Sequence, residues 1–413
     1  MANKANADKN FDCIILGGGL VGLTAAAALS TINLRSALIE KSSLKPTKLG
    51  MGDPRTTAIA ASGQVMLETL GIWAFLEQFA EPILDIRVSE KSLNSFVHYN
   101  HHEASKKPMG YIVENSILKN TLIRFAQRRR EISIFADITL KDYTADDTSV
   151  RVQLADGSII TGDLLIAADG SDSYARDLAG IQTTRLDYRQ TSIVFSVAHS
   201  TPHFGVAHER FLSGGPIAFL PMKNNMSSAI WTEETLVAKS LMELEEAHFL
   251  EGASLRIEDC LGRLKLIGKR AAFPLSLINA ETQIADRLAL IGDSAHKIHP
   301  IAGQGFNLGL RDIAHLADKL GEAKYLGLDA GSPEVLRKFQ ASRDLDKMSL
   351  ITATDSLNRL FSNNYQSIRM VRGLGLSVVN RLSPLKRLFM SAAMGNLGDL
   401  PNLLRGKSPT HND

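Results

Sequence analysis

The first forty residues restrict most strongly what this chain can fold into, because they join a short strand, a glycine-rich turn and a small-residue helix. The apolar strand Phe11 to Leu16 leads into Gly17-Gly18-Gly19-Leu20-Val21-Gly22, and a second strand, Ala37 to Ile39, ends at Glu40. This order predicts a βαβ unit in which glycines admit a pyrophosphate and an acid about 20 residues on binds a ribose. The residues predicted to bind a dinucleotide are Gly17, Gly19, Gly22 and Glu40.

A similar pattern of strand, glycine and helix recurs in the second half of the chain. The apolar run Leu288 to Ile291 is followed by Gly292-Asp293, and then by Gly303 and Gly305 ahead of a helical pattern from about Asn307. Glycines let a backbone approach a large ligand, and a helix N-terminus offers free N–H donors. Asp293 adds oxygens that accept hydrogen bonds from ligand hydroxyls. The first motif alone fits NAD or FAD, and this second contact point favours an extended flavin.

The run from His299 to Asp312, HPIAGQGFNLGLRD, resembles the signature of the ubiquinone-biosynthesis aromatic hydroxylases, and all fourteen positions fit. These enzymes are FAD-dependent monooxygenases of the para-hydroxybenzoate hydroxylase type. The resemblance implies that Pro300 lines the isoalloxazine ring where the chemistry occurs. It also implies that the following helix start directs its amides at the flavin pyrimidine oxygen, through Gly303, Gln304, Gly305 and Asn307.

Three further positions match this family. The stretch Asp53 to Ala58, DPRTTA, resembles one in which the arginine approaches the flavin pyrophosphate, so Arg55 is predicted there, with an ordinary surface cation as the alternative. Asn115 matches a flavin-contacting position, with a helix-capping role as the alternative. A strand that ends at Asp169-Gly170, followed by Ser173 and Arg176, resembles the family motif ADGxxSxxR, which assigns Asp169 and Gly170 to the flavin site.

The resemblance implies an α/β fold. A Rossmann-like FAD-binding domain is interleaved with a β-sheet substrate domain, and a C-terminal helical tail follows. We place the FAD-binding domain at residues 1–82, 110–182 and 275–350, and the substrate domain at residues 83–109 and 183–274. The tail comprises residues 351–413. Strand-rich sequence between about Asp187 and Pro274 supports the substrate sheet, and an expected helix, Leu236 to Leu250, interrupts it.

Composition excludes several other classes of protein. A formal net charge of +2 gives no reason to expect nucleic acid, and two cysteines, Cys13 and Cys260, cannot form a disulfide framework. No signal peptide or membrane span is expected, which favours a cytoplasmic location. No cysteine, aspartate or glutamate lies at ligand spacing from the histidines at 98, 101 and 102, and the pair His296 and His299 has no third ligand, so no metal is predicted. The latter pair is not assigned as a general base.

The tail carries an uneven charge. Asp399 is the only acid between Arg359 and Lys407, whereas the bases in that span are Arg359, Arg369, Arg372, Arg381, Lys386, Arg387, Arg405 and Lys407. Apolar residues recur there at helical spacing up to Pro384. A basic amphipathic stretch of this kind either lies on an anionic membrane surface or packs on the flavin domain or across a dimer.

The resemblance implies hydroxylation of the ring of a membrane-borne polyprenylated phenol by O2, through a flavin C4a-hydroperoxide. The cofactor is FAD, and the reductant is an external one, NAD(P)H or a ferredoxin-type donor. No second GxGxxG motif is present, so no separate NAD(P)H domain is expected. Implied partners are a ubiquinone-biosynthesis complex and a second copy of the chain, with peripheral attachment to the membrane. The alternatives are a flavin monooxygenase that acts on a soluble aromatic, and a non-catalytic scaffold of such a complex. Halogenation is disfavoured because Trp73 and Trp231 lie far apart.

Overall fold

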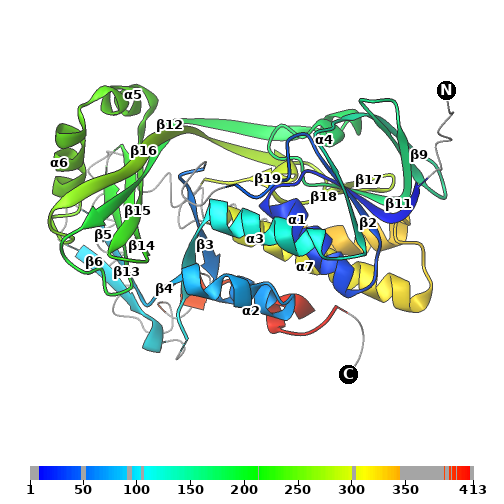
Figure 1. Ribbon diagram of the computed structural model, residues 1–413, viewed down its shortest axis with the longest axis horizontal. Helices are drawn as coiled ribbons and strands as arrows, with labels where there is room; N and C mark the ends of the chain where they lie inside the picture. The colour runs from blue at the N-terminus through cyan, green and yellow to red at the C-terminus, as the bar shows by residue number, and fades with distance from the viewer. Residues whose placement is uncertain are drawn as a thin grey trace.

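The computed structural model shows two lobes joined by two long strands, β12 (Thr183–His199) and β16 (Leu264–Ala280) (Figure 1). The structure describes residues 9–47, 53–90, 95–103, 107–212, 214–299, 304–344, 386, 390–391, 393–396 and 398–409. Strand β12 pairs antiparallel with β16 along most of its length. Each lobe therefore shares a continuous hydrogen-bonded ribbon with the other, which fixes how the two halves of the site face one another.

The first lobe is built on a largely parallel sheet with the strand order β17-β18-β11-β1-β2-β8, to which β10 and β9 are added antiparallel. Helices α1 and α7 pack against each other beside it, and α1 also packs on α3. The predicted first strand, small-residue helix and second strand are all confirmed. The elements are β1 (Lys9–Leu16), α1 (Leu20–Thr31), β2 (Ser36–Glu40), α3 (Asn115–Gln127), β8 (Ile132–Ala136), β9 (Leu140–Ala145), β10 (Val150–Leu154), β11 (Ile159–Ala167), β17 (Ile284–Ala285), β18 (Leu288–Leu290) and α7 (Gln304–Leu326).

The second lobe is a mixed sheet in the order β19-β16-β12-β15-β14-β13-β5-β6. Helices α5 (Thr235–Glu243) and α6 (Glu246–Arg256) cover one of its faces (Figure 1). The single helix expected from Leu236 to Leu250 is thus two helices, because Leu244 and Glu245 have extended backbones. The other strands are β5 (Asp85–Glu90), β6 (Ser95–Asn100), β13 (Val206–Leu212), β14 (Gly215–Met222), β15 (Met226–Glu234) and β19 (His296–Lys297).

A small third sheet, in the order β3-β7-β4, lies between the two lobes. Its strands are β3 (Thr56–Ala60), β4 (Glu81–Ile83) and β7 (Gly110–Glu114), and α2 (Ala61–Thr69) follows β3 directly. The predicted domain limits at residues 82/83 and 109/110 fall within or beside this sheet, and the full set of domain boundaries stays a prediction.

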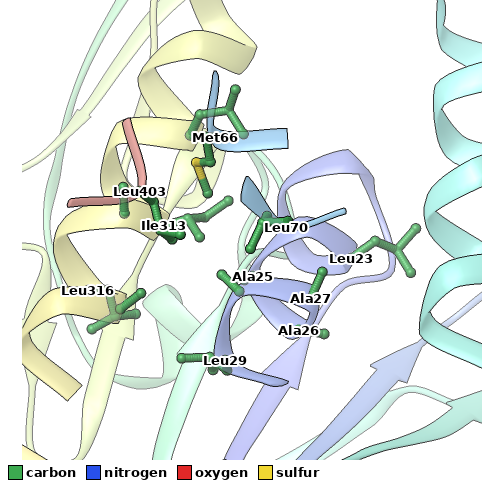
Figure 2. Packing of buried hydrophobic residues seen from close by; sticks show 14 of the residues in the cluster. Leu23, Ala25, Ala26, Ala27, Leu29, Met66, Leu70, Ile313, Leu316 and Leu403 are labelled. Carbon is green, nitrogen blue, oxygen red and sulfur yellow. The ribbon is translucent and has the colours of Figure 1, made fainter. Parts of the chain in front are cut away.

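The main core explains why α1 is so rich in alanine. Ala25, Ala26 and Ala27 are buried, and small side chains let α1 approach its neighbours closely (Figure 2). Larger residues complete the cluster, among them Ile313 of α7 and Leu403 from the end of the chain. Burying a leucine side chain of this kind contributes about 1.5–3 kcal/mol. Leu403 and its neighbour Leu404 are therefore part of the folded core.

The described end of the tail contacts the first lobe. The backbone of Asn402 donates to Asp318 of α7 (2.9 Å), and Arg311 donates to the carbonyl of Gly395 (3.0 Å). Together with the buried Leu403, these contacts show that the described residues 394–396 and 398–409 contact the first lobe. Most of the predicted amphipathic region, from Arg359 onward, lies outside the described residues.

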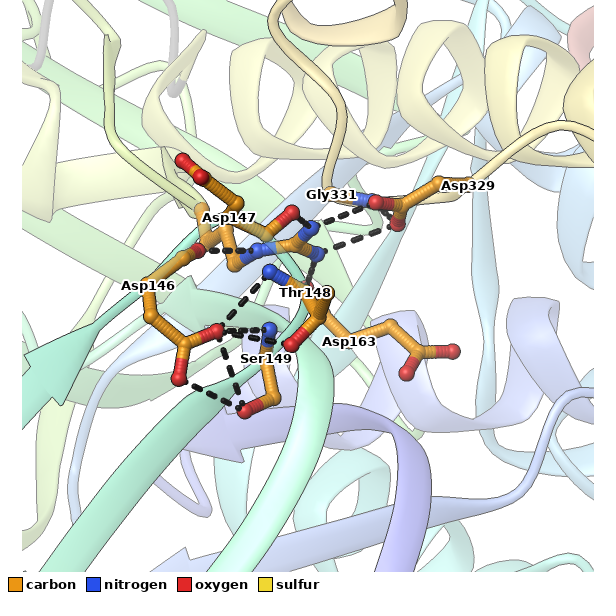
Figure 3. Close-up of polar contacts among 8 residues, drawn as sticks. Asp146, Asp147, Thr148, Ser149, Asp163, Asp329 and Gly331 are labelled. Atoms are coloured by element: carbon orange, nitrogen blue, oxygen red, sulfur yellow. Dashed lines mark hydrogen bonds and ion pairs between the residues drawn. The ribbon is translucent and has the colours of Figure 1, made fainter.

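Arg287 fixes the edge of the first sheet beside β18. Its guanidinium donates to the carbonyl oxygens of Asp146 (2.8 Å) and Asp163 (2.8 Å) and pairs with the Asp329 carboxylate. Figure 3 shows Asp146, Asp163 and Asp329, from three separate segments, gathered at this point. The turn that precedes β18 is thereby held against β11.

No helix in the described residues is long and apolar enough to span a membrane.

Candidate active site

The register of the parallel strands brings four predicted motifs to one edge of the first sheet. Leu16, the last residue of β1, pairs with Ile39 of β2 and with Ala167 of β11, and Ala167 pairs in turn with Leu290 of β18. The residues that follow these strand ends must therefore emerge side by side. We call this set the strand-end cluster: Gly17, Gly19, Gly22, Glu40, Asp169, Gly170 and Asp293.

The three motif glycines serve different purposes. Gly17 has φ +100°, and a Cβ atom there would lie 2.3 Å from the carbonyl oxygen of Ala168. A Cβ on Gly22 would lie 1.9 Å from the carbonyl oxygen of Gly17, so both positions need glycine for packing alone. Gly19 is exposed, and in the described part of the chain no heavy atom lies within 4 Å of where its Cβ would be. Its open space adjoins the N-terminal amides of α1, where an anionic group is favoured.

Glu40 is oriented by the glycine turn itself. One carboxylate oxygen accepts a hydrogen bond from the Gly18 amide (2.5 Å), and the other accepts from the amide and hydroxyl of Ser42. Burial alone would raise the pKa of Glu40, but these hydrogen bonds outweigh it and lower that pKa. The side chain is therefore a fixed, ionised acceptor at the position predicted for a ribose.

Arg55 and Asn115 both bind Asp53, a residue to which the sequence motif assigned no role. Asp53 forms a two-point ion pair with Arg55 (Nε–Oδ1 2.8 Å, Nη2–Oδ2 2.6 Å) and accepts a weaker bond from Asn115 (3.3 Å). Asn115 also accepts from the Thr57 hydroxyl (2.6 Å), and it is the first residue of α3 rather than its cap, so the capping alternative is wrong. Arg55 is exposed and lies over the ring of Phe273, 5.0 Å from its centre.

The third motif is tied to the second by a buried arginine. Arg176 is fully buried and donates to the carbonyl oxygens of Ser171 (3.1 Å) and Ser294 (3.0 Å), the residue after Asp293. Ser173 caps the short helix α4 (Tyr174–Leu178) by accepting from the Arg176 amide. Asp169 accepts from the amide of Ala175 (3.3 Å), and within the described residues its buried Oδ1 has no partner.

Behind Asp293 lies an ion-pair network that the sequence analysis did not foresee. The fully buried Asp312 accepts from the Gly292 amide (2.8 Å) and pairs with His296 (3.0 Å) and Arg343 (2.7 Å). Burial would raise the pKa of Asp312, but the charges of His296 and Arg343 hold it well below its ordinary value. The signal was present, because Asp312 closes the recognised fourteen-residue run, but Arg343 lies in no motif.

Asp293 itself differs from the other carboxylates of the cluster. Its side chain is exposed, yet the surrounding protein displaces enough water to raise its pKa, against the opposing charges of His296, Lys297 and Arg55. An exposed acid in such surroundings gains from accepting ligand hydrogen bonds, which favour its charged form.

The structure describes some of the residues that were predicted to contact the flavin at the start of α7, but not all of them. The helix begins at Gln304, slightly earlier than expected, and Gly305 is exposed in its first turn. The Asn307 side chain accepts from the Ala60 amide (2.9 Å) and donates to the Ala58 carbonyl (2.9 Å), so it ties β3 to α7. Pro300 and Gly303 lie outside the described residues.

A cavity lies between the second lobe and the start of α7. It encloses about 870 Å³ of empty space, including its open mouth, and its wall is mostly apolar. Residues of the second and third sheets line it, and His299 and Asn307 mark the side near α7. The ring of His299 also meets the edge of Tyr188, with ring centres 5.0 Å apart. A cavity with a mostly apolar wall and a few polar side chains suits an aromatic molecule with apolar substituents.

The described residues fit FAD by their own chemistry. Glycines at close backbone approaches, an open helix N-terminus, an ionised Glu40 and the unpartnered buried oxygen of Asp169 are the features a dinucleotide needs. In the described chain no group of histidines, cysteines and acids could hold a metal ion.

Comparison with known protein families agrees with this geometry. A family model described as FAD binding domain matches residues 10–350. The chain belongs to this family of FAD-binding proteins. It is 41% identical to ubiquinone hydroxylase UbiL of Rhodospirillum rubrum, over 97% of this chain and 94% of that one. It is 28% identical to the mitochondrial ubiquinone biosynthesis monooxygenase COQ6 of Drosophila melanogaster, over 95% of this chain and 92% of that one. The resemblance found in the sequence, and with it the prediction of an FAD-dependent monooxygenase, is confirmed.

Solved structures of other proteins share the fold of this chain. The p-nitrophenol 4-monooxygenase PnpA from Pseudomonas putida DLL-E4 matches with a TM-score of 0.77 at 16% identity, over 95% of this chain and all of that one. PqsL from Pseudomonas aeruginosa matches with a TM-score of 0.74 at 20% identity, over 90% of this chain and all of that one. At these identities the likeness concerns the fold, and the predicted α/β fold is confirmed.

Proposed function

We propose that this chain hydroxylates the aromatic ring of a polyprenylated phenol in ubiquinone biosynthesis, with O2 and FAD. The observation that carries the proposal is the apolar cavity bordered by His299 and by Asn307 in the first turn of α7. The UbiL and COQ6 relatives support it, because both are named for hydroxylation in ubiquinone biosynthesis. Bound FAD supplies the activation of O2 and the oxygen transfer, after reduction by NAD(P)H or a ferredoxin-type donor.

In this proposal the protein holds, orients and shields the reactants. Glu40 binds a ribose, Arg55 approaches the pyrophosphate, and Asp169, Gly170 and Asp293 bind the remainder of the extended dinucleotide. The first amides of α7 stabilise negative charge on the flavin ring system through the partial positive charge of the helix end. Pro300 lines the reacting face, and Gly303, Gln304 and Gly305 supply the helix start; the backbone of Asn307 contributes there while its side chain fixes β3.

A deletion strain tests this function directly. We expect loss of ubiquinone and accumulation of a polyprenylated phenol that lacks one ring oxygen. The wild-type gene should restore ubiquinone, whereas Asp293→Ala should not, because it removes charge-assisted hydrogen bonds worth about 1.5–3 kcal/mol each. Normal ubiquinone in the deletion strain would contradict the proposal and leave a soluble aromatic as the substrate. Purified protein that consumes no O2 with reductant and phenol would instead indicate a scaffold.

The substrate's apolar chain leads us to propose peripheral contact with the membrane. The uneven charge after Arg359 supports this route, because each basic residue near an anionic surface contributes about 1 kcal/mol. Full-length protein should co-sediment with anionic vesicles at low salt and release at high salt, since screening acts over about 8 Å at physiological ionic strength. Indifference to such vesicles would favour delivery by a complex or by a second copy of the chain, which light scattering and copurification would detect.

A further inference from the structure

The wall of the cavity on the second lobe is made by one face of four neighbouring strands. In β13, β14 and β15 the register places Glu209 beside Ala218, and Ala218 beside Ile230. Side chains alternate across a sheet, so these three share a face, and the intervening residues point toward α5 and α6. Small residues such as Ala207 and Ala218 leave room on the cavity side, and Glu209 stands within that room.

Glu209 is an isolated charge in this wall. Of the described residues that line the cavity, it alone has a carboxylate, and none is a lysine or arginine. The next residue, Arg210, belongs to the opposite face and pairs with Glu258 (2.5 Å). Within the described chain, the side chain of Glu209 has no hydrogen bond or ion pair, and burial alone raises its pKa from 4.5 to about 7. Tyr99 of β6 has a pKa raised to about 12, by burial and then by the charge of Glu209.

The half-buried Glu209 carboxylate loses part of its hydration on this apolar wall and gains no partner from the described chain in exchange, which costs free energy. Its presence at a ligand wall therefore indicates that a ligand supplies the partner. A carboxyl oxygen accepts a hydrogen bond from a ring hydroxyl in either protonation state. By contrast, a ring carboxylate would find no cation in the described lining and a like charge on Glu209.

We propose that Glu209 binds the ring hydroxyl of the substrate and selects a neutral phenol over a ring that carries a carboxylate. This inference rests on the proposed function. It adds the charge class of the substrate and the residue that distinguishes one charge class from another. Glu209 is a positioning and selectivity residue, and no proton transfer is assigned to it.

A pair of probes that differ by one carboxylate tests this assignment. The flavin-loaded enzyme is titrated at pH 8, without reductant, with 2-allylphenol and with 3-allyl-4-hydroxybenzoate, and binding is followed by flavin absorbance. Wild type should bind the phenol about ten- to a hundred-fold more tightly, because like charges several ångströms apart repel strongly at an effective dielectric of about 20. Glu209→Gln keeps an acceptor oxygen without the charge, so the preference should fall by about ten-fold or more.

Two further variants separate charge from hydrogen bonding. Glu209→Asp keeps the charge but withdraws the carboxylate, so phenol binding should weaken while exclusion of the benzoate persists. Glu234→Gln, an exposed acid at the end of β15 outside the described lining, is the matched control and should leave both affinities unchanged. An unchanged preference in Glu209→Gln, with wild-type flavin spectrum, overturns the assignment alone. If wild type binds neither probe, the proposed phenolic substrate falls, and this inference falls with it.

Discussion

In the strand-end cluster and in the apolar cavity, the pKa values of carboxylates shift in opposite directions. Glu40 of the cluster, and Asp53 beside Arg55, lie among amide, hydroxyl and guanidinium donors, and these bonds lower the pKa of both carboxyls despite burial. Glu209 lies on an apolar wall with no such donor in the described chain, and burial raises its pKa. Asp293 is the exception within the strand-end cluster. Its side chain is exposed, yet the surrounding protein displaces enough water to raise its pKa.

The difference follows from how each side is made. The strand-end cluster is built from backbone that turns sharply at the ends of parallel strands, where free N–H groups are plentiful. The cavity wall on the second lobe is the middle of a mixed sheet, whose backbone groups are already paired, so its side chains decide its character. A site for an anionic dinucleotide and a site for an apolar ring can therefore adjoin one another without sharing residues.

The largest expected effect comes from the tightest backbone approach. Gly22→Ala places a Cβ 1.9 Å from the Gly17 carbonyl oxygen, so the turn cannot keep its shape. We expect little soluble protein and no bound flavin, as judged by yield and by absorbance. Gly19→Ala is the matched control for folding, because its Cβ meets no described atom; it should fold normally and weaken FAD binding. Equal behaviour of the two variants would contradict the separate roles of these glycines.

A second test contrasts the two faces of β15. Trp231 is fully buried against Phe249 of α6, with ring centres 5.3 Å apart, and donates to Glu233 (3.0 Å). Trp231→Ala should lower the free energy of unfolding by about 3–5 kcal/mol, measured by urea denaturation. The adjacent Ile230 already borders the cavity, so Ile230→Ala should cost about 1 kcal/mol. Similar losses for both would mean that the cavity side is packed as tightly as the helix-covered side.

Filling the cavity should separate binding from stability. Ala218→Phe inserts a ring into empty space between Glu209 and Ile230, so phenol affinity should fall by about a hundred-fold, while FAD stays bound. Because the space is already open, the unfolding free energy should change by less than about 1.5 kcal/mol. Ala218→Ser, of similar size, is the control and should bind the phenol nearly as wild type does. Full phenol binding by Ala218→Phe would place the substrate elsewhere.

The same contrast explains which parts of the site the sequence could predict. Gly17 to Gly22 and Asp169-Gly170 are local signals, because strand, turn and helix follow one another and parallel register brings their ends together. Glu209 stands in an ordinary strand, and its significance depends on Ala218 and Ile230, which only the sheet register places beside it. Arg343 likewise gains its role from a contact with Asp312 that no spacing predicts. The sequence could therefore predict helices and strands, but not the contacts between side chains that are far apart in the chain.

The smallest expected effect is a pH dependence that the cavity carboxylate imposes on stability. The pKa of Glu209 is raised from 4.5 to about 7 in the folded protein, so between these values the folded state binds more protons than the unfolded state. Its contribution therefore makes stability fall as pH rises through this range. A shift of this size corresponds to at most about 3 kcal/mol, and for a partly exposed side chain we expect about 1–2 kcal/mol.

Unfolding of wild type and Glu209→Gln by urea at pH 5, 6, 7 and 8 isolates this contribution. The variant has no charge to bury, so its stability relative to wild type should rise by about 1–2 kcal/mol from pH 5 to pH 8. His208, whose pKa burial lowers to about 4, titrates in the opposite sense but does so in both proteins, and its effect cancels in the difference. Glu234→Gln should follow wild type throughout. Parallel curves for wild type and Glu209→Gln would show that Glu209 is solvated, and the opposition between cluster and cavity would then rest on packing alone.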